Sequence, residues 1–193
     1  MMNTRRPLIL ASGSPRRKEL LALMGLPYEV DVSDADETIE GTPAPQDIVR
    51  ELSRRKALSV APRHESALVL AADTIVYLDG VLGKPKTHER AAQMLRELSG
   101  KWHDVYTGLT LIDTATGALM QRVERTRVHF APMTQKEIEA YAATDEPLDK
   151  AGAYAVQGMG GMFVDRIEGS HSNVIGLPMS ALRELLAQMD EAQ

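Results

Sequence analysis

Cysteine is absent from the 193 residues, so disulfides, zinc–thiolate sites and cysteine nucleophiles are excluded together, and a reducing compartment is favoured. Aromatic residues make up only 4% of the chain, which is too few for a surface that stacks nucleic-acid bases. No apolar run approaches the roughly 20 residues of a membrane span, and the stretch Leu8–Ala11 is too short for a signal peptide. We therefore expect a cytoplasmic protein whose partners include neither a membrane nor a nucleic-acid polymer.

The composition that is present is typical of a globular protein. Apolar residues make up 44% and charged residues 25% of the chain, which allows a sizeable core and an ordinary surface. The length suits one domain, and we expect it to cover residues 1–193. Because the formal net charge is −5, the chain as a whole does not attract polyanions, and a phosphate site would need locally placed basic residues.

Strand and helix signals alternate along the chain, which predicts an α/β fold. The nearly continuous apolar run 67–78 is typical of a strand buried on both faces. Thr87 and Gly100 delimit one helix, and Thr134 with Glu137 predicts a capping box for another. The expected strands cover 7–10, 28–32, 67–78, 81–82, 103–112, 119–130 and 162–167, the expected helices cover 15–24, 45–61, 88–99, 135–143 and 178 onward, and an acidic loop covers 33–46.

The stretch ASGSPRRKEL, residues 11–20, predicts a turn from a strand into a helix. Ser14 suits the cap and Pro15 the first helical position. Arg16, Arg17 and Lys18 then fill the first turn, although that end of a helix already carries partial positive charge. An anion bound there would account for the three cations. The alternative is a solvated basic turn, and the stretch lacks the Gly-Lys-Ser ending of a Walker loop.

Asp73 stands in the middle of the apolar run 67–78. A buried carboxylate costs free energy unless it is paired or bound to a metal. We therefore interpret Asp73 as a candidate general base. The alternative, a strand end or bulge where the carboxylate meets water, is disfavoured by the apolar residues on both sides.

Two lysines have a functional and a plainer interpretation. Lys56 falls inside the apolar arc of the helix 45–61, between Leu52 and Val49. Its ammonium group therefore either points into a cleft or snorkels at the edge of the arc. Lys84, in GKPK, either contacts a ligand or is an exposed loop lysine.

The acidic loop and a glycine-rich segment complete the candidate residues. Asp36 and Glu37 would join Asp73 in holding a hard cation through oxygen ligands, or would belong to a solvated loop. The segment Asp149–Gly161 has enough glycine for close backbone approach to a ligand, or forms a flexible connection. Carboxylates, cations and a helix N-terminus together make up the inventory of a metal-assisted phosphoryl site.

In these motifs and their order the chain resembles the Maf family of nucleoside triphosphate pyrophosphatases. The resemblance runs from Leu8 to about Leu186, through LASGSPRRKELL, DADE, RRKA, AADTIV, GKP, MLRELSG, DEPLDKAGAYAVQG and GLP. It implies a fold like that of the inosine triphosphate pyrophosphatases: an elongated α/β molecule with a central mixed sheet, helices on both faces and a cleft between two lobes. It also implies hydrolysis of a nucleoside triphosphate to the monophosphate and pyrophosphate with a divalent cation, Mg²⁺ or Mn²⁺.

The resemblance implies roles for particular residues. Asp73 is the implied proton acceptor, and Asp73 and Glu37 are the implied metal-side acids. The positions that match base-preference residues are Arg16, Thr74 and Gln157. The positions that match phosphate contacts are Ser12, Arg17, Lys56 and Lys84. Ala155 stands where the family usually has glycine, and we expect little effect from it.

Arg16, Thr74 and Gln157 match the branch of the family that prefers dTTP and UTP. The branch that acts on 7-methyl-guanosine triphosphate is the alternative, but it carries a bulky aromatic residue near position 16. Modified pyrimidine triphosphates also remain candidate substrates, and a homodimer is compatible with the resemblance. A nucleotide-binding regulator of cell division (septum formation) is a further alternative, which the intact Asp73 disfavours. A kinase is disfavoured by the missing Walker loop.

Overall fold

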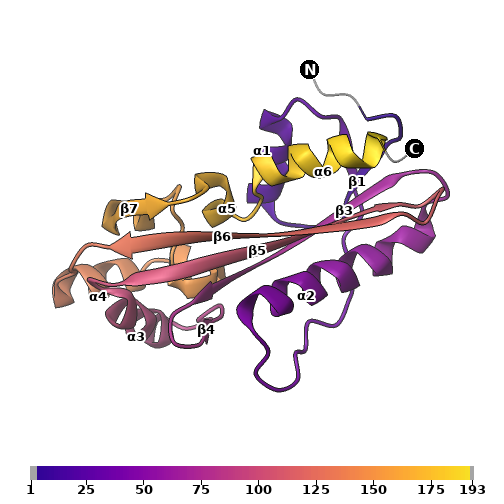
Figure 1. The fold of residues 1–193 in the computed structure, drawn as a ribbon. Coiled ribbons are helices and arrows are strands. Elements are labelled where there is room, and N and C mark those ends of the chain that lie inside the picture. Colours follow the sequence, from indigo (N-terminus) through magenta and orange to yellow (C-terminus); the bar gives the residue numbers. More distant parts are fainter. Residues whose placement is uncertain (1–3, 192–193) are drawn as a thin grey trace. The chain divides into compact units, whose positions relative to one another are not determined.

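A computed structural model of the chain describes residues 4–191 and has an α/β fold. A seven-stranded mixed sheet runs in the order β2-β1-β3-β5-β6-β7, and β4 pairs with β3 (Figure 1). The strands are β1 (Leu8–Leu10), β2 (Tyr28–Val30), β3 (Leu68–Tyr77), β4 (Val81–Leu82), β5 (Trp102–Asp113), β6 (Leu119–Phe130) and β7 (Val164–Glu168). The α-helices are α1 (Pro15–Leu23), α2 (Pro45–Val60), α3 (His88–Leu98), α4 (Gln135–Ala142), α5 (His171–Ile175) and α6 (Met179–Glu191). Short 3₁₀ helices are η1 (Ala61–Arg63), η2 (Glu146–Asp149), η3 (Ala151–Ala153) and η4 (Met159–Phe163).

The chain forms two compact units, each of which is described by itself. The described part of the first unit comprises 4–73, 107–124 and 176–191, and the second comprises 74–106 and 125–175. The strands β3, β5 and β6 contribute residues to both units. The elongated shape and the cleft between lobes that the sequence predicts stay predictions.

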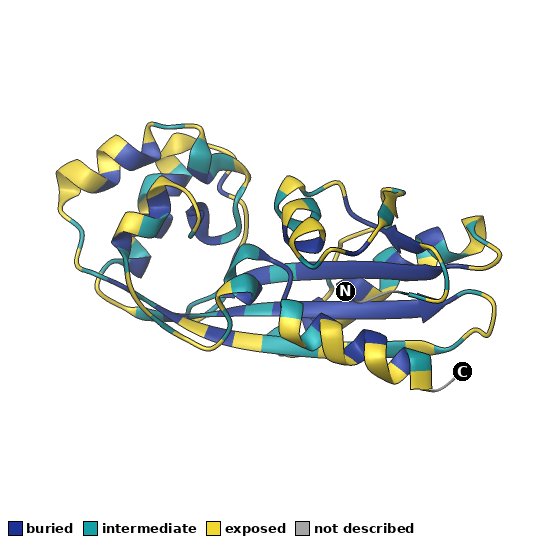
Figure 2. Ribbon diagram, turned by 90° about the horizontal axis from the view of Figure 1, so that it is seen from above, coloured by how far each residue is buried: buried dark blue, intermediate teal, exposed yellow. Residues whose placement is uncertain are grey.

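In the first unit, three parallel strands and the helices on both faces of the sheet build the core. β1 pairs in parallel with both β2 and β3, so that Leu8 lies opposite Tyr28 on one side and Leu68 on the other. Helices α1 and α6 cover one face of this part of the sheet, and α2 covers the other (Figure 1). Figure 2 shows that strands at the centre of the sheet are buried over much of their length.

Helix α2 approaches β5 unusually closely. A Cβ atom on Gly108 would collide with the backbone carbonyl of Val49, so only glycine allows the helix to sit at this depth. Ser53 Oγ lies 2.9 Å from Thr110 Oγ1, in a buried hydrogen bond between α2 and β5. Glycine and the buried hydroxyl pair together fix where α2 lies on the sheet.

The second unit has its own core, between its part of the sheet and the helices α3 and α4, which contact each other. Its largest fully buried side chain is Phe130, and the ring of Tyr154 packs edge-on against it at 4.8 Å between centroids. β7 closes the sheet by pairing antiparallel with β6. Gly152 adopts a φ of 68°, and its missing side chain makes room for Val76.

Most of the predicted elements are confirmed, with differences at their ends. α1 begins after Ser14 as predicted, but the Ser14 side chain makes no capping hydrogen bond within the described residues. The capping box of Thr134 and Glu137 is present at α4. The strand expected from residue 162 begins at Val164, because η4 occupies the residues before it. Within residues 4–191, no helix combines the length and apolar character needed to cross a membrane.

Candidate active site in the first unit

The candidate residues of the first unit lie around the carboxyl ends of three adjacent parallel strands. Ser12 comes two residues after β1, and Glu37 lies in the loop that follows β2. Asp73 lies on β3, three residues beyond Leu70, which is the register partner of the last residue of β1. Ligands bind outside the carboxyl ends of the strands in open α/β sheets. The topology therefore brings together three residues that are far apart in the sequence.

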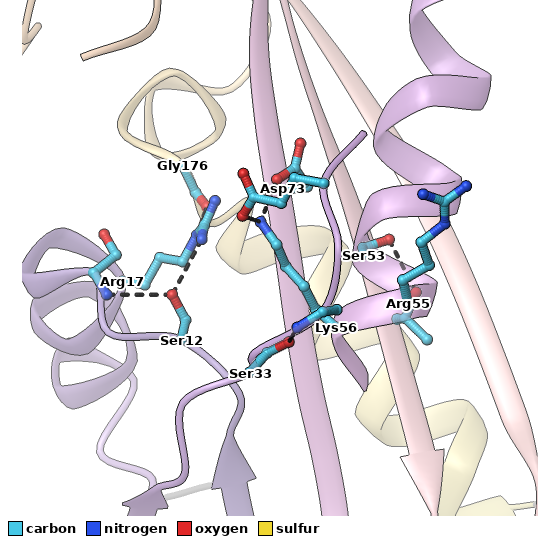
Figure 3. Close-up of polar contacts among 12 residues, drawn as sticks. Ser12, Arg17, Ser33, Ser53, Arg55, Lys56, Asp73 and Gly176 are labelled. Atoms are coloured by element: carbon cyan, nitrogen blue, oxygen red, sulfur yellow. Dashed lines mark hydrogen bonds and ion pairs between the residues drawn. The ribbon is translucent and has the colours of Figure 1, made fainter. Parts of the chain in front are cut away.

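Lys56 joins two carboxylates. Its Nζ lies 2.6 Å from Asp73 Oδ1 and 2.7 Å from Glu37 Oε1. Figure 3 shows the Lys56 side chain reaching from α2 to Asp73 on β3. The side chains of Lys56 and Asp73 are only 13% and 11% exposed, so the ammonium group provides the partner that a buried carboxylate needs. The structure thus supports the inward orientation of Lys56 rather than the snorkelling alternative.

Arg17 bridges the turn after β1 and the segment that precedes α6. Its Nη1 donates to Ser12 Oγ at 3.1 Å, and its Nε donates to the carbonyl oxygen of Gly176 at 2.9 Å (Figure 3). Ser12 Oγ also accepts the backbone N–H of Ser14 at 3.3 Å. The guanidinium is therefore held in one place rather than extended into solvent.

The electrostatics of Arg17 connect it to the same carboxylates. Burial lowers the pKa of its guanidinium from the usual value, and the nearby cation Arg16 acts in the same direction. The charges of Asp73 and Glu37 oppose this change. Because arginine remains protonated in proteins, the first unit presents two fixed cations, Arg17 and Lys56, beside two carboxylates. An anion bound here would have to compete with the two carboxylates for these cations.

Arg55 anchors the acidic loop, and the sequence analysis did not identify it. Its Nη1 donates to the carbonyl oxygen of Thr38 at 2.8 Å and to that of Asp36 at 3.4 Å, one residue on either side of Glu37. Its Nε donates to Glu51 Oε1 at 2.8 Å, one helical turn earlier on α2. The only signal in the sequence is this Glu51–Arg55 spacing, which is equally typical of a surface ion pair.

Asp36 differs from Glu37 in how its carboxylate is used. Asp36 Oδ1 accepts the backbone N–H of Thr38 at 2.9 Å, which forms a turn within the loop. Hydrogen bonding to Thr38 lowers the pKa of Asp36. Glu37 is the residue that reaches Lys56, so the structure places Glu37 rather than Asp36 beside Asp73.

The remaining sequence candidates belong to the second unit. Thr74 follows Asp73 on β3 and is partly buried, whereas Lys84 and Gln157 are exposed. The backbone around Lys84 is held by hydrogen bonds from Gly152 N to Gly83 O, 3.2 Å, and from Lys86 N to Leu148 O, 3.2 Å. The predicted approach of Thr74, Lys84 and Gln157 to a ligand at the first unit stays a prediction.

The residues present fit a hard divalent cation. Asp73 and Glu37 already direct one oxygen each at a single cationic atom. Magnesium is typically held by one or two carboxylates, with substrate phosphate oxygens and water as the other ligands. Across residues 4–191, no group of three or more His, Cys, Asp or Glu side chains is placed to hold a metal ion. A cation held by Asp73 and Glu37 would take its other ligands from the substrate and water.

An α/β fold with cations and carboxylates gathered at the carboxyl ends of parallel strands is typical of proteins that bind small ligands at that edge of the sheet. The model of the Maf-like protein family matches residues 7–189, and the chain belongs to the Maf family. It is 51% identical to a dTTP/UTP pyrophosphatase of Bacillus cytotoxicus, over 94% of this chain and 95% of that protein. It is 50% identical to a dTTP/UTP pyrophosphatase of Desulforamulus reducens, over 94% and 95%, and 49% identical to one of Bacillus mycoides, over 96% of each.

Among solved structures, the chain is similar to protein VC0702 from Vibrio cholerae with a TM-score of 0.34 and 10% identity. That similarity covers 64% of this chain and 61% of the other. A TM-score at this level carries no argument about the fold or function of this chain.

Proposed function

We propose that this chain is a nucleoside triphosphate pyrophosphatase that hydrolyses dTTP and UTP to the monophosphate and pyrophosphate. Its membership of the Maf family and the names of relatives 49–51% identical over nearly their whole length support the proposal. The structural observation that carries it is the buried Asp73 carboxylate, 2.6 Å from a lysine on the neighbouring helix. This arrangement provides a proton acceptor and a phosphate-binding cation side by side.

In the proposed reaction, Arg17 and Lys56 bind the triphosphate. Phosphate oxygens compete with Glu37 and Asp73 for the Lys56 ammonium group. Because this group has three N–H donors, it can bind several oxygens at once. Asp73 then accepts a proton from the attacking water. The water adds across the anhydride bond between the α- and β-phosphates, so the monophosphate and pyrophosphate leave as separate products. Fixed cations matter because phosphoryl transfer is accelerated mainly by positioning and by stabilisation of charge on the phosphate oxygens.

We also propose that Glu37 and Asp73 hold a divalent cation, Mg²⁺ or Mn²⁺, when the nucleotide is bound. A bound divalent cation neutralises charge on the phosphate oxygens. The donor set supports this because both carboxylates already point at one cationic atom. Lys56 and the divalent cation would then share the negative charge of the carboxylates and the triphosphate.

The test is a panel of the eight common nucleoside triphosphates with purified protein, in which both products are identified. The expected result is monophosphate plus pyrophosphate, with UTP and dTTP as the preferred substrates. Release of orthophosphate or a phosphorylated acceptor would show a different reaction. Tight binding of UTP without turnover would favour a nucleotide-binding regulator instead.

A further inference from the structure

Glu146, in the second unit, holds the glycine-rich turn that follows Gln157. Its Oε1 accepts the hydroxyl of Tyr141 at 2.7 Å and the backbone N–H of Gly160 at 2.9 Å. Its Oε2 accepts the backbone N–H of Met159 at 3.0 Å. One carboxylate therefore caps the first two N–H groups of η4 and is itself held by a buried tyrosine.

The protonation states of Glu146 and Tyr141 suit the hydrogen bonds that they make. Desolvation raises the pKa of Glu146, but the hydrogen bonds from Gly160, Tyr141 and Met159 outweigh it, so that the pKa is lowered overall. Burial raises the pKa of Tyr141, so its hydroxyl keeps the proton that it donates. Hydrogen bonds to a charged acceptor are roughly twice as strong as those between neutral groups.

Close packing adds to the hydrogen bonds. A Cβ atom on Gly158 would collide with the Glu146 carboxylate, and one on Gly160 would lie 2.5 Å from the Tyr141 hydroxyl oxygen. The backbone closes the turn with hydrogen bonds from Gly158 N to Ala155 O and from Gly161 N to Gly158 O, both 3.1 Å. The glycines at 158 and 160 are therefore required for contact with Glu146 and Tyr141, and the segment is not a flexible connection.

Gln157 stands immediately before the part of the turn that Glu146 holds. Its own side chain is exposed, whereas the backbone N–H groups of the four residues that follow it, 158–161, are all held by the hydrogen bonds described above. An exposed amide can select a base only if its backbone is held, because a side chain that moves cannot leave a mismatched base unpaired. Both carboxylate oxygens of Glu146 accept hydrogen bonds from the turn or from Tyr141.

We propose that Glu146 is a positioning residue for base selection, which acts by fixing the backbone that carries Gln157. This inference rests on the proposed function and deepens it, since it assigns the control of pyrimidine preference to a carboxylate that lies 11 residues before Gln157 in the sequence. Tyr141 has the same positioning role, because its hydroxyl donates to the Glu146 carboxylate.

The test compares Glu146→Gln and Tyr141→Phe with wild type, using kcat/KM for UTP and for CTP. Glutamine keeps the size of the side chain but replaces one acceptor oxygen with an NH₂ group that opposes the donors around it. We expect the UTP-to-CTP preference to fall about tenfold in Glu146→Gln and less in Tyr141→Phe, which removes one hydrogen bond of three. Amide hydrogen exchange at Met159 and Gly160 should become faster in both variants.

A double variant separates positioning from a general structural effect. If Glu146 acts through Gln157, then Gln157→Ala should lower the preference much less in the Glu146→Gln background than in wild type. Glu137→Gln is the matched control, since Glu137 caps α4 in the same unit and should leave the preference unchanged. Equal losses of kcat/KM for UTP and CTP in Glu146→Gln, or additive effects in the double variant, would overturn the inference. Wild-type protein that hydrolyses no triphosphate would instead overturn the proposed function, and base selection by Glu146 with it.

Discussion

Lys56 and Asp73 form an ion pair of 2.6 Å although 17 residues separate them in the sequence. The proposed base is thus paired with the cation that is proposed to bind phosphate. A triphosphate that attracts the Lys56 ammonium group would release Asp73 to accept a proton. Binding and activation of the base would then be one event, which would restrict the reaction to molecules that carry phosphate.

Replacement of Asp73 by asparagine should abolish most of the hydrolysis and keep the fold. Asparagine has the same shape but cannot accept the proton of the attacking water, and a positioned base typically contributes about 10²–10⁴ in rate. Lys56 keeps Glu37 as a partner. The measurement is kcat for UTP, with a thermal melt. Asp79→Asn is the control, since Asp79 is exposed and lies at a φ of 55°, which asparagine tolerates. UTP hydrolysis by Asp73→Asn within a few-fold of wild type would rule Asp73 out as the base.

Chelation should remove activity, and Lys56 should compete with the divalent cation. We expect no turnover in EDTA and recovery with Mg²⁺ or Mn²⁺.

Lys56→Met leaves Glu37 and Asp73 without their shared ammonium partner. Nucleotide-free protein should therefore bind Mn²⁺ more tightly, while KM for UTP rises. Calorimetric Mn²⁺ titration measures the first effect. Lys84→Met, at an exposed loop, should leave Mn²⁺ binding unchanged. Full activity in EDTA, or equal Mn²⁺ affinity in Lys56→Met and wild type, contradicts this view.

Arg55 should matter for activity more than for stability. Arg55→Gln removes the hydrogen bonds to the carbonyl oxygens on either side of Glu37, so Glu37 loses its fixed position. We expect kcat/KM for UTP to fall about tenfold, as for the loss of one or two hydrogen bonds. The adjacent Arg54→Gln is the control, because the Arg54 side chain is 48% exposed and pairs with Glu51 at 3.7 Å. Similar kinetics for the two variants would show that the loop needs no anchor.

Gln157 should decide between pyrimidines. A side-chain amide offers both donors and an acceptor, which match the carbonyl and N–H edge that uracil and thymine share. Cytosine presents an amino group and a bare ring nitrogen, so an amide held in the orientation that suits uracil would meet a wrong partner at each hydrogen bond, at about 1–3 kcal/mol each. We expect Gln157→Ala to lose preference for UTP and dTTP over CTP. The measurement is kcat/KM for the eight common triphosphates. An unchanged ranking would remove Gln157 from base selection but leave the pyrophosphatase proposal intact.

His103 should make the protein less stable in acid. Burial lowers the pKa of His103 to about 4, and its Nε2 lies 2.8 Å from the Tyr154 hydroxyl. The unfolded chain, with a histidine pKa near 6.5, takes up the proton first as pH falls. Stability contributed by neutral His103 is therefore complete above about pH 6.5 and is lost down to about pH 4, by up to about 3 kcal/mol. Urea unfolding at pH 7.5 and pH 5 measures it. The double variant His103→Phe, Tyr154→Phe should lose less stability at pH 5 than wild type; an equal loss would assign the acid sensitivity elsewhere.

Local patterns in the sequence were sufficient for most of the fold. The periodicity after Pro45 predicts α2, the apolar run predicts β3, and Thr134 with Glu137 predicts the start of α4, because each signal lies within one element. The angle of Lys56 on α2 falls within the apolar arc, but this pattern alone left the snorkelling orientation open, and only the family resemblance favoured the inward one.

Contacts between distant segments were not visible in the same way. The hydrogen bonds from Arg55 to the acidic loop depend on where that loop approaches α2. No periodic pattern in the sequence predicts this approach. Glu146 reaches Gly160, 14 residues further along the chain, through irregular backbone, so the sequence left both a ligand contact and a flexible connection open. α5 has only five residues, too few to show helical periodicity.

The missing side chain of Gly108 has a consequence for chemistry that takes place elsewhere. The carbonyl group of Val49 packs directly against Gly108. Val49 lies seven residues before Lys56 on α2, which is two helical turns and about 10 Å along the same face. A single methyl group at position 108 would collide with the Val49 backbone and push α2 away from β5, and the backbone that carries Lys56 would move away from Asp73 with it. The length of the Lys56–Asp73 ion pair would therefore depend on a position that touches neither of its members.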